Sequence, residues 1–154
     1  MDSAYSFPPH FRFGTSTSAA QIESAVGHDW EGFRAIDGSV FSGTTRHEQN
    51  LDEDLDIIRT LAPNYRMSLM WSRLQLQPFA PLDPDAVAHY HRLFRGLQER
   101  NVSVMLVLHH FANPTWFAAM GGWSSSRAVD AFLDYVDKIL DEFGAYPDSF
   151  NTFN

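Results

Sequence analysis

The stretch that decides the fold reads Val102-Ser103-Val104-Met105-Leu106-Val107-Leu108 and continues directly into His109-His110-Phe111-Ala112-Asn113-Pro114. Its first part is almost continuously apolar, which is typical of a strand buried on both faces of a parallel sheet. The residues that follow are polar or aromatic. Since ligands of parallel α/β folds bind just beyond the carboxyl ends of the strands, this junction predicts a buried strand that leads into a binding site.

Strand and helix patterns alternate on both sides of this stretch. Further strands are expected near residues 11–15, over 65–72 and over 149–153. Apolar and polar residues alternate over 65–72, and the segment 149–153 follows the third expected helix. Such alternation indicates a parallel sheet covered by helices. An eightfold barrel of this kind needs about 250 residues, so four strands and three helices make close to half of one.

The three expected helices each carry an apolar stripe at helical spacing. The first presents Leu51, Leu55, Ile58 and Leu61. The second starts at the cap Asp83-Pro84 and presents Val87, Tyr90, Phe94 and Leu97. The third is capped by a serine within 124–126, ends at Gly144 and buries Val129, Phe132, Val136, Ile139, Leu140 and Phe143.

The composition favours a folded domain and argues against several classes of partner. The chain has 154 residues, of which 44% are hydrophobic, so it can bury a core. Its net charge of −8 disfavours nucleic acid and anionic membrane surfaces as partners. No stretch approaches the roughly 20 apolar residues of a membrane span, and the first residues lack the basic and apolar regions of a secretory signal. There is no cysteine, which excludes disulfides. We expect a cytoplasmic location and no cofactor.

Two features near the strand ends have competing interpretations. His109 and His110 invite a metal site, but adjacent strand residues point to opposite faces and cannot chelate one ion together, so no metal is expected. The inward histidine either donates to a substrate hydroxyl or is a satisfied core residue. Glu23 lies close to the end of the first strand. A glutamate in such a position more often forms a structural ion pair than takes part in catalysis. The loop over residues 27–46 is long enough to be functional.

Glycosidase chemistry requires two carboxylates, about 5–5.5 Å apart when the configuration is retained. Most acidic residues of this chain are expected on the solvated surface. No two of them make a convincing pair of acid and nucleophile. From the residues alone, the interpretation stops at half of a parallel α/β barrel with a polar cleft.

Four blocks, in the right order, resemble glycoside hydrolase family 1, the β-glucosidase family. They are residues 7–23, which end in Gln21-Ile22-Glu23, residues 65–73, residues 108–114 with Gly121-Gly122-Trp123, and residues 150–154. The resemblance implies a (β/α)8 TIM barrel. Residues 1–154 would be the N-terminal part of that domain, with the first three βα units and the fourth strand.

The resemblance also implies roles for individual residues. Gln21, His110 and Asn154 would hydrogen-bond the hydroxyls of a β-glycoside or monosaccharide in the −1 subsite. Phe111 takes a place usually held by tryptophan and would wall the sugar pocket. Arg66 would hold the nucleophile ionised, with a structural ion pair as the alternative. The loop over residues 27–46 is short for the family, so we expect an open aglycone side.

In the family, the acid/base glutamate follows the residue matched by Asn154, and the nucleophile lies much further on. We therefore expect the lone chain, as the front part of a retaining β-glycosidase, to be inactive. A non-catalytic sugar-binding remnant and a half-barrel completed by a partner chain are the alternatives. Because the first and fourth strands would be unpaired edges, we expect a homo-oligomer, a completing chain or an unstable monomer.

Overall fold

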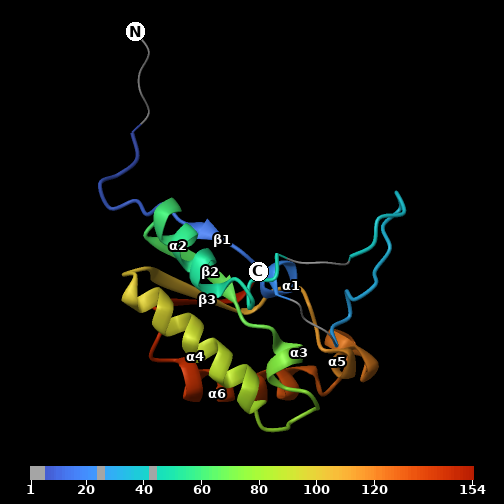
Figure 1. The fold of residues 1–154 in the computed structure, drawn as a ribbon. Helices are drawn as coiled ribbons and strands as arrows, with labels where there is room; N and C mark the ends of the chain where they lie inside the picture. The colour runs from blue at the N-terminus through green and yellow to red at the C-terminus, as the bar shows by residue number, and fades with distance from the viewer. Residues whose placement is uncertain (1–5, 24–26, 42–44) are drawn as a thin grey trace.

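The computed structural model describes residues 6–23, 27–41 and 45–154, and within them the chain forms one four-stranded sheet packed against helices (Figure 1). The strands β1 (Thr15–Ser16), β2 (Asn64–Ser68), β3 (Ser103–His109) and β4 (Ser149–Phe153) lie in chain order, and all neighbours are parallel. This arrangement confirms the predicted α/β class. The prediction about a secretory signal, at residues 1–5, and part of the predicted loop, at 42–44, lie outside the described residues.

Three long helices connect the strands in the described part of the chain: α2 (Leu51–Leu61), α4 (Pro84–Glu99) and α6 (Ala128–Phe143). Shorter turns lie beside the carboxyl ends of the strands, namely α1 (Ala19–Ile22), α3 (Trp71–Leu74), α5 (Thr115–Ala119) and the 3₁₀ turn η1 (Gly122–Ser124). Asp83 caps α4 as predicted, since its Oδ1 accepts from the Ala86 amide at 2.9 Å. None of the helices in the described ranges is long and apolar enough to cross a bilayer.

The cap predicted for α6 is wrong in detail. Arg127 precedes the helix, and no side chain caps it. Ser125 instead accepts from the Arg127 amide at 3.2 Å, one residue too early to serve the helix itself.

The predicted apolar stripes of the helices include three residues that are exposed to solvent. Leu61, Val129 and Leu140 are exposed, at 65%, 63% and 41%. In α6 the buried stripe runs through residues four apart, so Val129 and Leu140 fall beside it rather than on it. The residues that form this stripe are Ala131, Tyr135, Ile139 and Phe143.

Strand β2 is shorter than predicted because the chain leaves the sheet after Ser68. The Met70 amide donates to the Tyr90 hydroxyl at 2.9 Å, which draws the chain toward α4. Trp71 then starts α3 and stacks on Tyr135, with ring centroids 4.9 Å apart. The predicted strand end at Trp71 is therefore a helical turn packed in the core.

Strand β1 is also shorter than predicted, and a close approach of backbones precedes it. A Cβ on Gly14 would lie 2.7 Å from the Asn64 carbonyl oxygen, so only glycine fits. The Asn64 side-chain amide donates to the Phe13 carbonyl at 2.7 Å and ties the segment to β2.

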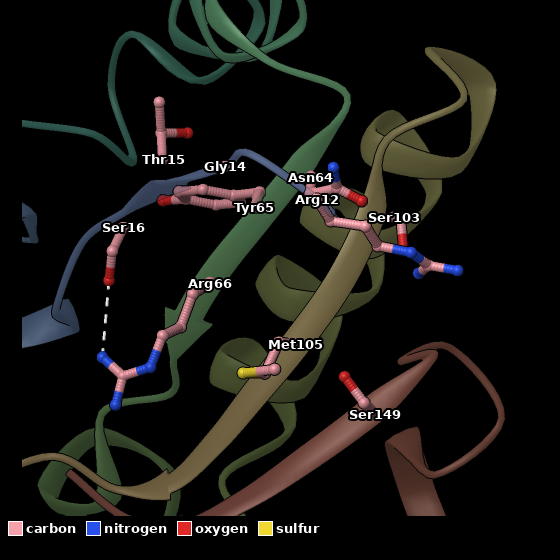
Figure 2. Close-up of a pocket in the computed structure, with 10 residues that line it drawn as sticks. All are labelled: Arg12, Gly14, Thr15, Ser16, Asn64, Tyr65, Arg66, Ser103, Met105 and Ser149. Carbon is pink, nitrogen blue, oxygen red and sulfur yellow. Dashed lines mark hydrogen bonds between the residues drawn. The ribbon is translucent and has the colours of Figure 1, made fainter. Parts of the chain in front are cut away.

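One face of the sheet is open. Met105 on β3 is 40% exposed, contrary to the expectation that this strand is buried on both faces. It lines a hollow of about 290 Å³ together with residues of β1, β2 and β4 (Figure 2). This open face corresponds to the inside of the expected barrel.

Candidate functional site

Arg66 joins the ends of three strands. Its Nη2 donates to the Asn154 Oδ1 at 2.8 Å, just beyond β4, and its Nη1 donates to the Ser16 Oγ at 3.4 Å on β1. Figure 2 shows the guanidinium reaching from β2 toward Ser16 along the edge of the hollow. Within the described ranges, no carboxylate lies at ion-pair distance from Arg66, so the alternative of a structural ion pair finds no partner there.

His110 presents an unsatisfied ring nitrogen at the end of β3. Its Nδ1 is buried and, among the described residues, has no hydrogen-bond partner. Burial lowers the pKa of His110, and the positive charge of Arg66 lowers it further. The ring is therefore neutral at pH 7, with one nitrogen that donates and one that accepts. Such a ring can bind a hydroxyl group, which both donates and accepts.

His109 has a different environment from its neighbour. It is buried, and its ring packs against Trp123 and Phe153 at centroid distances of 5.0 and 5.2 Å. Its Nε2 pairs with the Asn113 Oδ1 at 2.9 Å. His109 is thus a satisfied core residue, whereas His110 is not. No group of three His, Cys, Asp or Glu side chains in the described part of the chain is placed to hold a metal ion.

Phe111 sits at a strained turn. Its φ of +50° lies in the left-handed region, which bulky residues rarely adopt. The Ala112 amide donates to the His110 carbonyl at 2.7 Å and closes the turn around Phe111. The Phe111 ring lies edge-on to the His110 ring, with centroids 5.5 Å apart. Strained backbone of this kind is often found at ligand sites. Here the turn places the Phe111 ring against His110, whose Nδ1 has no partner among the described residues.

Asn113 holds this turn in place, although no individual role was predicted for it beyond its membership of the third block. Its amide nitrogen donates to the Asp29 Oδ2 at 2.7 Å, and its backbone amide donates to Asp29 Oδ1 at 2.8 Å. Its Oδ1 accepts from the Trp123 indole at 3.1 Å. The available signal was the Asn-Pro pair, which is typical of turns. Trp123 therefore supports the turn through this bond.

Helix α1 carries Gln21 and is fixed at both ends. At its start, the Ala19 amide donates to the buried Ser68 Oγ at 3.0 Å. At its end, Glu23 is 1% exposed and accepts from the Tyr90 hydroxyl at 2.8 Å and from Arg73 Nη1 at 3.1 Å. Burial raises the pKa of Glu23 to about 7, and these two partners oppose the rise. The ion pair expected for Glu23 is confirmed, and Tyr90 is a partner that the sequence did not predict.

The structure brings together most of the predicted site residues. Arg66 and Asn154 are hydrogen-bonded, His110 is close enough for Arg66 to affect its pKa, and Phe111 contacts His110. Gln21 is exposed and accepts from the Ser18 Oγ at 2.8 Å. No hydrogen bond within the described residues joins it to the other four. Its helix nevertheless lies next to them, since Ala19, Ala20 and His110 line one narrow gap.

These groups can bind a neutral ligand that carries several hydroxyls. They offer a cation, two side-chain amides, a neutral imidazole and an aromatic wall. None of the carboxylates in the described ranges lines the hollow beside Arg66. The strand ends therefore combine hydrogen-bonding groups with an aromatic ring, beside a hollow that no carboxylate of the described residues lines.

Comparisons with known proteins point to one family. Residues 3–154 match the sequence profile of glycosyl hydrolase family 1. A β-glucosidase from Agrobacterium sp. (strain ATCC 21400) is 31% identical over 96% of this chain and 35% of its own. A 6-phospho-β-galactosidase from Lacticaseibacillus rhamnosus is 30% identical over 88% of this chain and 30% of its own.

The fold gives the same result. The crystal structure of a β-glucosidase from Exiguobacterium marinum superposes with a TM-score of 0.89 and 29% identity, over 97% of this chain and 36% of that one. The chain thus spans about a third of the length of the relatives it matches.

Proposed function

The chain belongs to glycosyl hydrolase family 1, and from that premise we propose that it forms the sugar-holding part of a β-glycosidase cleft. Residues 1–154 would then be one continuous piece of a single TIM-barrel domain. The observation that carries the proposal is the cluster at the strand ends, where Arg66 and Asn154 are joined beside the unsatisfied His110.

In this proposal Gln21, His110 and Asn154 hydrogen-bond the hydroxyls of a sugar in the −1 subsite. The neutral ring of His110 supports this role, because a buried nitrogen without a partner gains most from a ligand hydroxyl. Phe111 walls the same pocket, and its position next to His110 supports that assignment. Hydrogen bonds to sugar hydroxyls contribute to catalysis when they become stronger at the transition state.

Arg66 is proposed to stand beside the nucleophilic carboxylate and to keep it ionised. Its guanidinium is only half-buried and has no carboxylate partner within the described ranges. A cation within a few Å lowers the pKa of a carboxylate and so favours the charged form that attacks.

The 154 residues by themselves are proposed to be inactive. Retention of configuration needs two carboxylates about 5–5.5 Å apart on either side of the scissile bond. Glu23, the carboxylate nearest in sequence to Gln21, is buried between Tyr90 and Arg73 and faces no cleft. We expect no release of nitrophenol from a nitrophenyl β-glucoside, and measurable turnover by the purified chain would contradict this.

A further polypeptide segment is proposed to cover the open face of the sheet, either as a completing chain or as a second copy. The exposure of Met105 and the unpaired edges of β1 and β4 support this part of the proposal. The size of the purified chain, measured by light scattering, tests it, because a stable, well-folded monomer is not expected. A cytoplasmic location stays a prediction from the sequence.

Calorimetric titration with glucose tests the sugar site. Replacing His110 by alanine removes one hydrogen-bonding partner, which is worth about 0.5–1.5 kcal/mol, so binding should weaken roughly two- to twelvefold. His91 offers a matched control on α4, where its ring bonds Tyr146 and Glu142 at 2.9 and 2.7 Å, and its replacement should leave binding unchanged. Equal effects of the two substitutions would contradict the proposed role of His110.

A further inference from the structure

A tyrosine, a histidine and a glutamate are hydrogen-bonded to one another where α4 meets the end of α6. His91 on α4 lies in the middle, with its Nδ1 2.9 Å from the Tyr146 hydroxyl and its Nε2 2.7 Å from the Glu142 Oε1. Glu142 belongs to the last turn of α6, and Tyr146 lies just beyond that helix. A hydroxyl, an imidazole and a carboxylate joined in this order form the arrangement that activates a nucleophile in many hydrolases.

The hydrogen-bond partners assign the protonation of the His91 ring. An ionised carboxylate only accepts hydrogen bonds, so Nε2 donates to Glu142. In a neutral imidazole the other nitrogen then accepts, and the Tyr146 hydroxyl donates to it. The Nδ1 of His91 is therefore a base in direct contact with the phenol proton. Glu142 stabilises the imidazolium that forms when this proton moves.

Tyr146 is the accessible tyrosine of the described ranges. Its ring stacks on Phe94, with centroids 4.9 Å apart and an angle of 8° between the planes, so its hydroxyl has a fixed direction. The residue is half-buried, whereas Tyr65, Tyr90 and Tyr135 are 2%, 0% and 1% exposed. Of these four side chains, Tyr146 is the one that a reagent from solvent reaches.

The histidine of this trio lines a groove between α4 and α6, two helices that run side by side in Figure 1. The groove has a volume of about 570 Å³. Its polar wall includes His91 and Glu142, and the opposite wall consists of apolar side chains ahead of and along α4, namely Pro81, Leu82, Pro84, Val87 and Ala88. An apolar wall beside a base suits a small ester that carries an aromatic group.

We propose that His91 and Glu142 activate the Tyr146 hydroxyl as a nucleophile toward aryl esters that bind in this groove. The Tyr146 Oη forms a bond to the carbonyl carbon of the ester, and the bond between that carbon and the aryl oxygen breaks. The phenol proton moves to the His91 Nδ1 and from there to the departing aryloxide or to water. The products are an acylated Tyr146 and a free phenol. This modification site does not rest on the proposed sugar site, and its failure would leave that site standing.

The test treats the 154-residue chain with nitrophenyl acetate at pH 7.5 and follows the acetylation of Tyr146 by mass spectrometry of its peptides. We expect Tyr146 to gain an acetyl group before Tyr65, Tyr90 or Tyr135. His91→Gln should slow the reaction at Tyr146 by about a hundredfold or more, the contribution of a general base. Glu142→Gln should slow it by about tenfold, the difference between a hydrogen bond to a charged partner and one to a neutral partner. Absence of acetyl-Tyr146 from the wild-type chain would overturn the proposal.

Asp141→Asn is the matched control for Glu142→Gln. Asp141 lines the same groove and carries the same charge, but the bond to His91 comes from Glu142. The control should acetylate at the wild-type rate, and a loss equal to that of Glu142→Gln would overturn the assigned role of Glu142.

The pH dependence gives a second measurement, on the unaltered chain. With His91 as the base, the rate of acetylation at Tyr146 should level off well below pH 10, the range in which a phenol without a base ionises by itself. A rate that rises steadily up to pH 10, or one that His91→Gln leaves unchanged, would overturn the activation of Tyr146.

Discussion

Replacing Glu23 by glutamine should change how the free energy of unfolding depends on pH. Burial raises the pKa of Glu23 from its ordinary 4.5 to about 7, despite the Tyr90 hydroxyl and the Arg73 guanidinium. Between these two values the folded chain binds more protons at this site than the unfolded chain. Stability therefore decreases as pH rises through the window. At 1.36 kcal/mol for each pH unit, the loss amounts to about 3 kcal/mol.

Glutamine cannot ionise, but it has nearly the same shape and keeps an oxygen that can accept from Tyr90. Urea unfolding followed by circular dichroism at pH 4.5, 6 and 7.5 measures both chains. The variant should gain about 3 kcal/mol relative to the wild type over this range. The difference between the chains is the useful quantity, because His89, whose pKa burial lowers to about 4, changes stability in the opposite direction in both of them.

Exposed Glu99 at the end of α4 provides a control, and its replacement by glutamine should leave the pH dependence as it is. If the stability of the Glu23→Gln variant stayed parallel to that of the wild type across this pH range, burial would not raise the pKa of Glu23. A variant that loses ground as pH rises would contradict the prediction as well, because it would mean that the attraction of Arg73 outweighs the cost of burial.

Three further predictions concern Gly14, Asn113 and His110. Gly14→Ala should lower the free energy of unfolding in urea by about 1–3 kcal/mol, since its Cβ would press on the Asn64 carbonyl, and an unchanged midpoint would count against the close packing of β1 on β2. Asn113→Asp places a second carboxylate against Asp29 and removes the amide that donates to it, so ¹⁵N relaxation of residues 27–41 should show more motion in the variant than in the wild type, and equal relaxation would count against this contact as an anchor of the loop. The His110 ring should titrate below pH 6.5 by NMR, because burial and Arg66 disfavour its charged form, and a pKa at or above 6.5 would contradict the buried site.

The order of strands and helices could be predicted from the sequence because it depends on local periodicity. The Asp83 cap and the stripe of Tyr90, Phe94 and Leu97 were found in α4 as predicted. The errors came from tertiary contacts. Periodicity alone could not show that the Met70 amide bonds Tyr90 and ends β2, or that β1 shrinks to a short pairing beside Gly14.

The candidate site was predictable only through resemblance to a family, because its residues lie far apart in the chain. The contact of Arg66 with Asn154 joins positions 88 residues apart, which no local pattern reveals. Strand geometry did predict that His109 and His110 have different surroundings, but it left open which of them is a satisfied core residue. Asn113 was not predicted to support the site, since its role depends on the loop of residues 27–41 docking on the turn after β3.

The sugar site that we propose lies between the ends of the strands. The most direct measurement is a map of ¹H–¹⁵N chemical-shift changes as glucose is added to the labelled chain. We predict changes concentrated at the side-chain amides of Gln21 and Asn154 and at the ring of His110. Changes confined to other surfaces, or none at any of these three residues at saturating glucose, would contradict a sugar site at the strand ends.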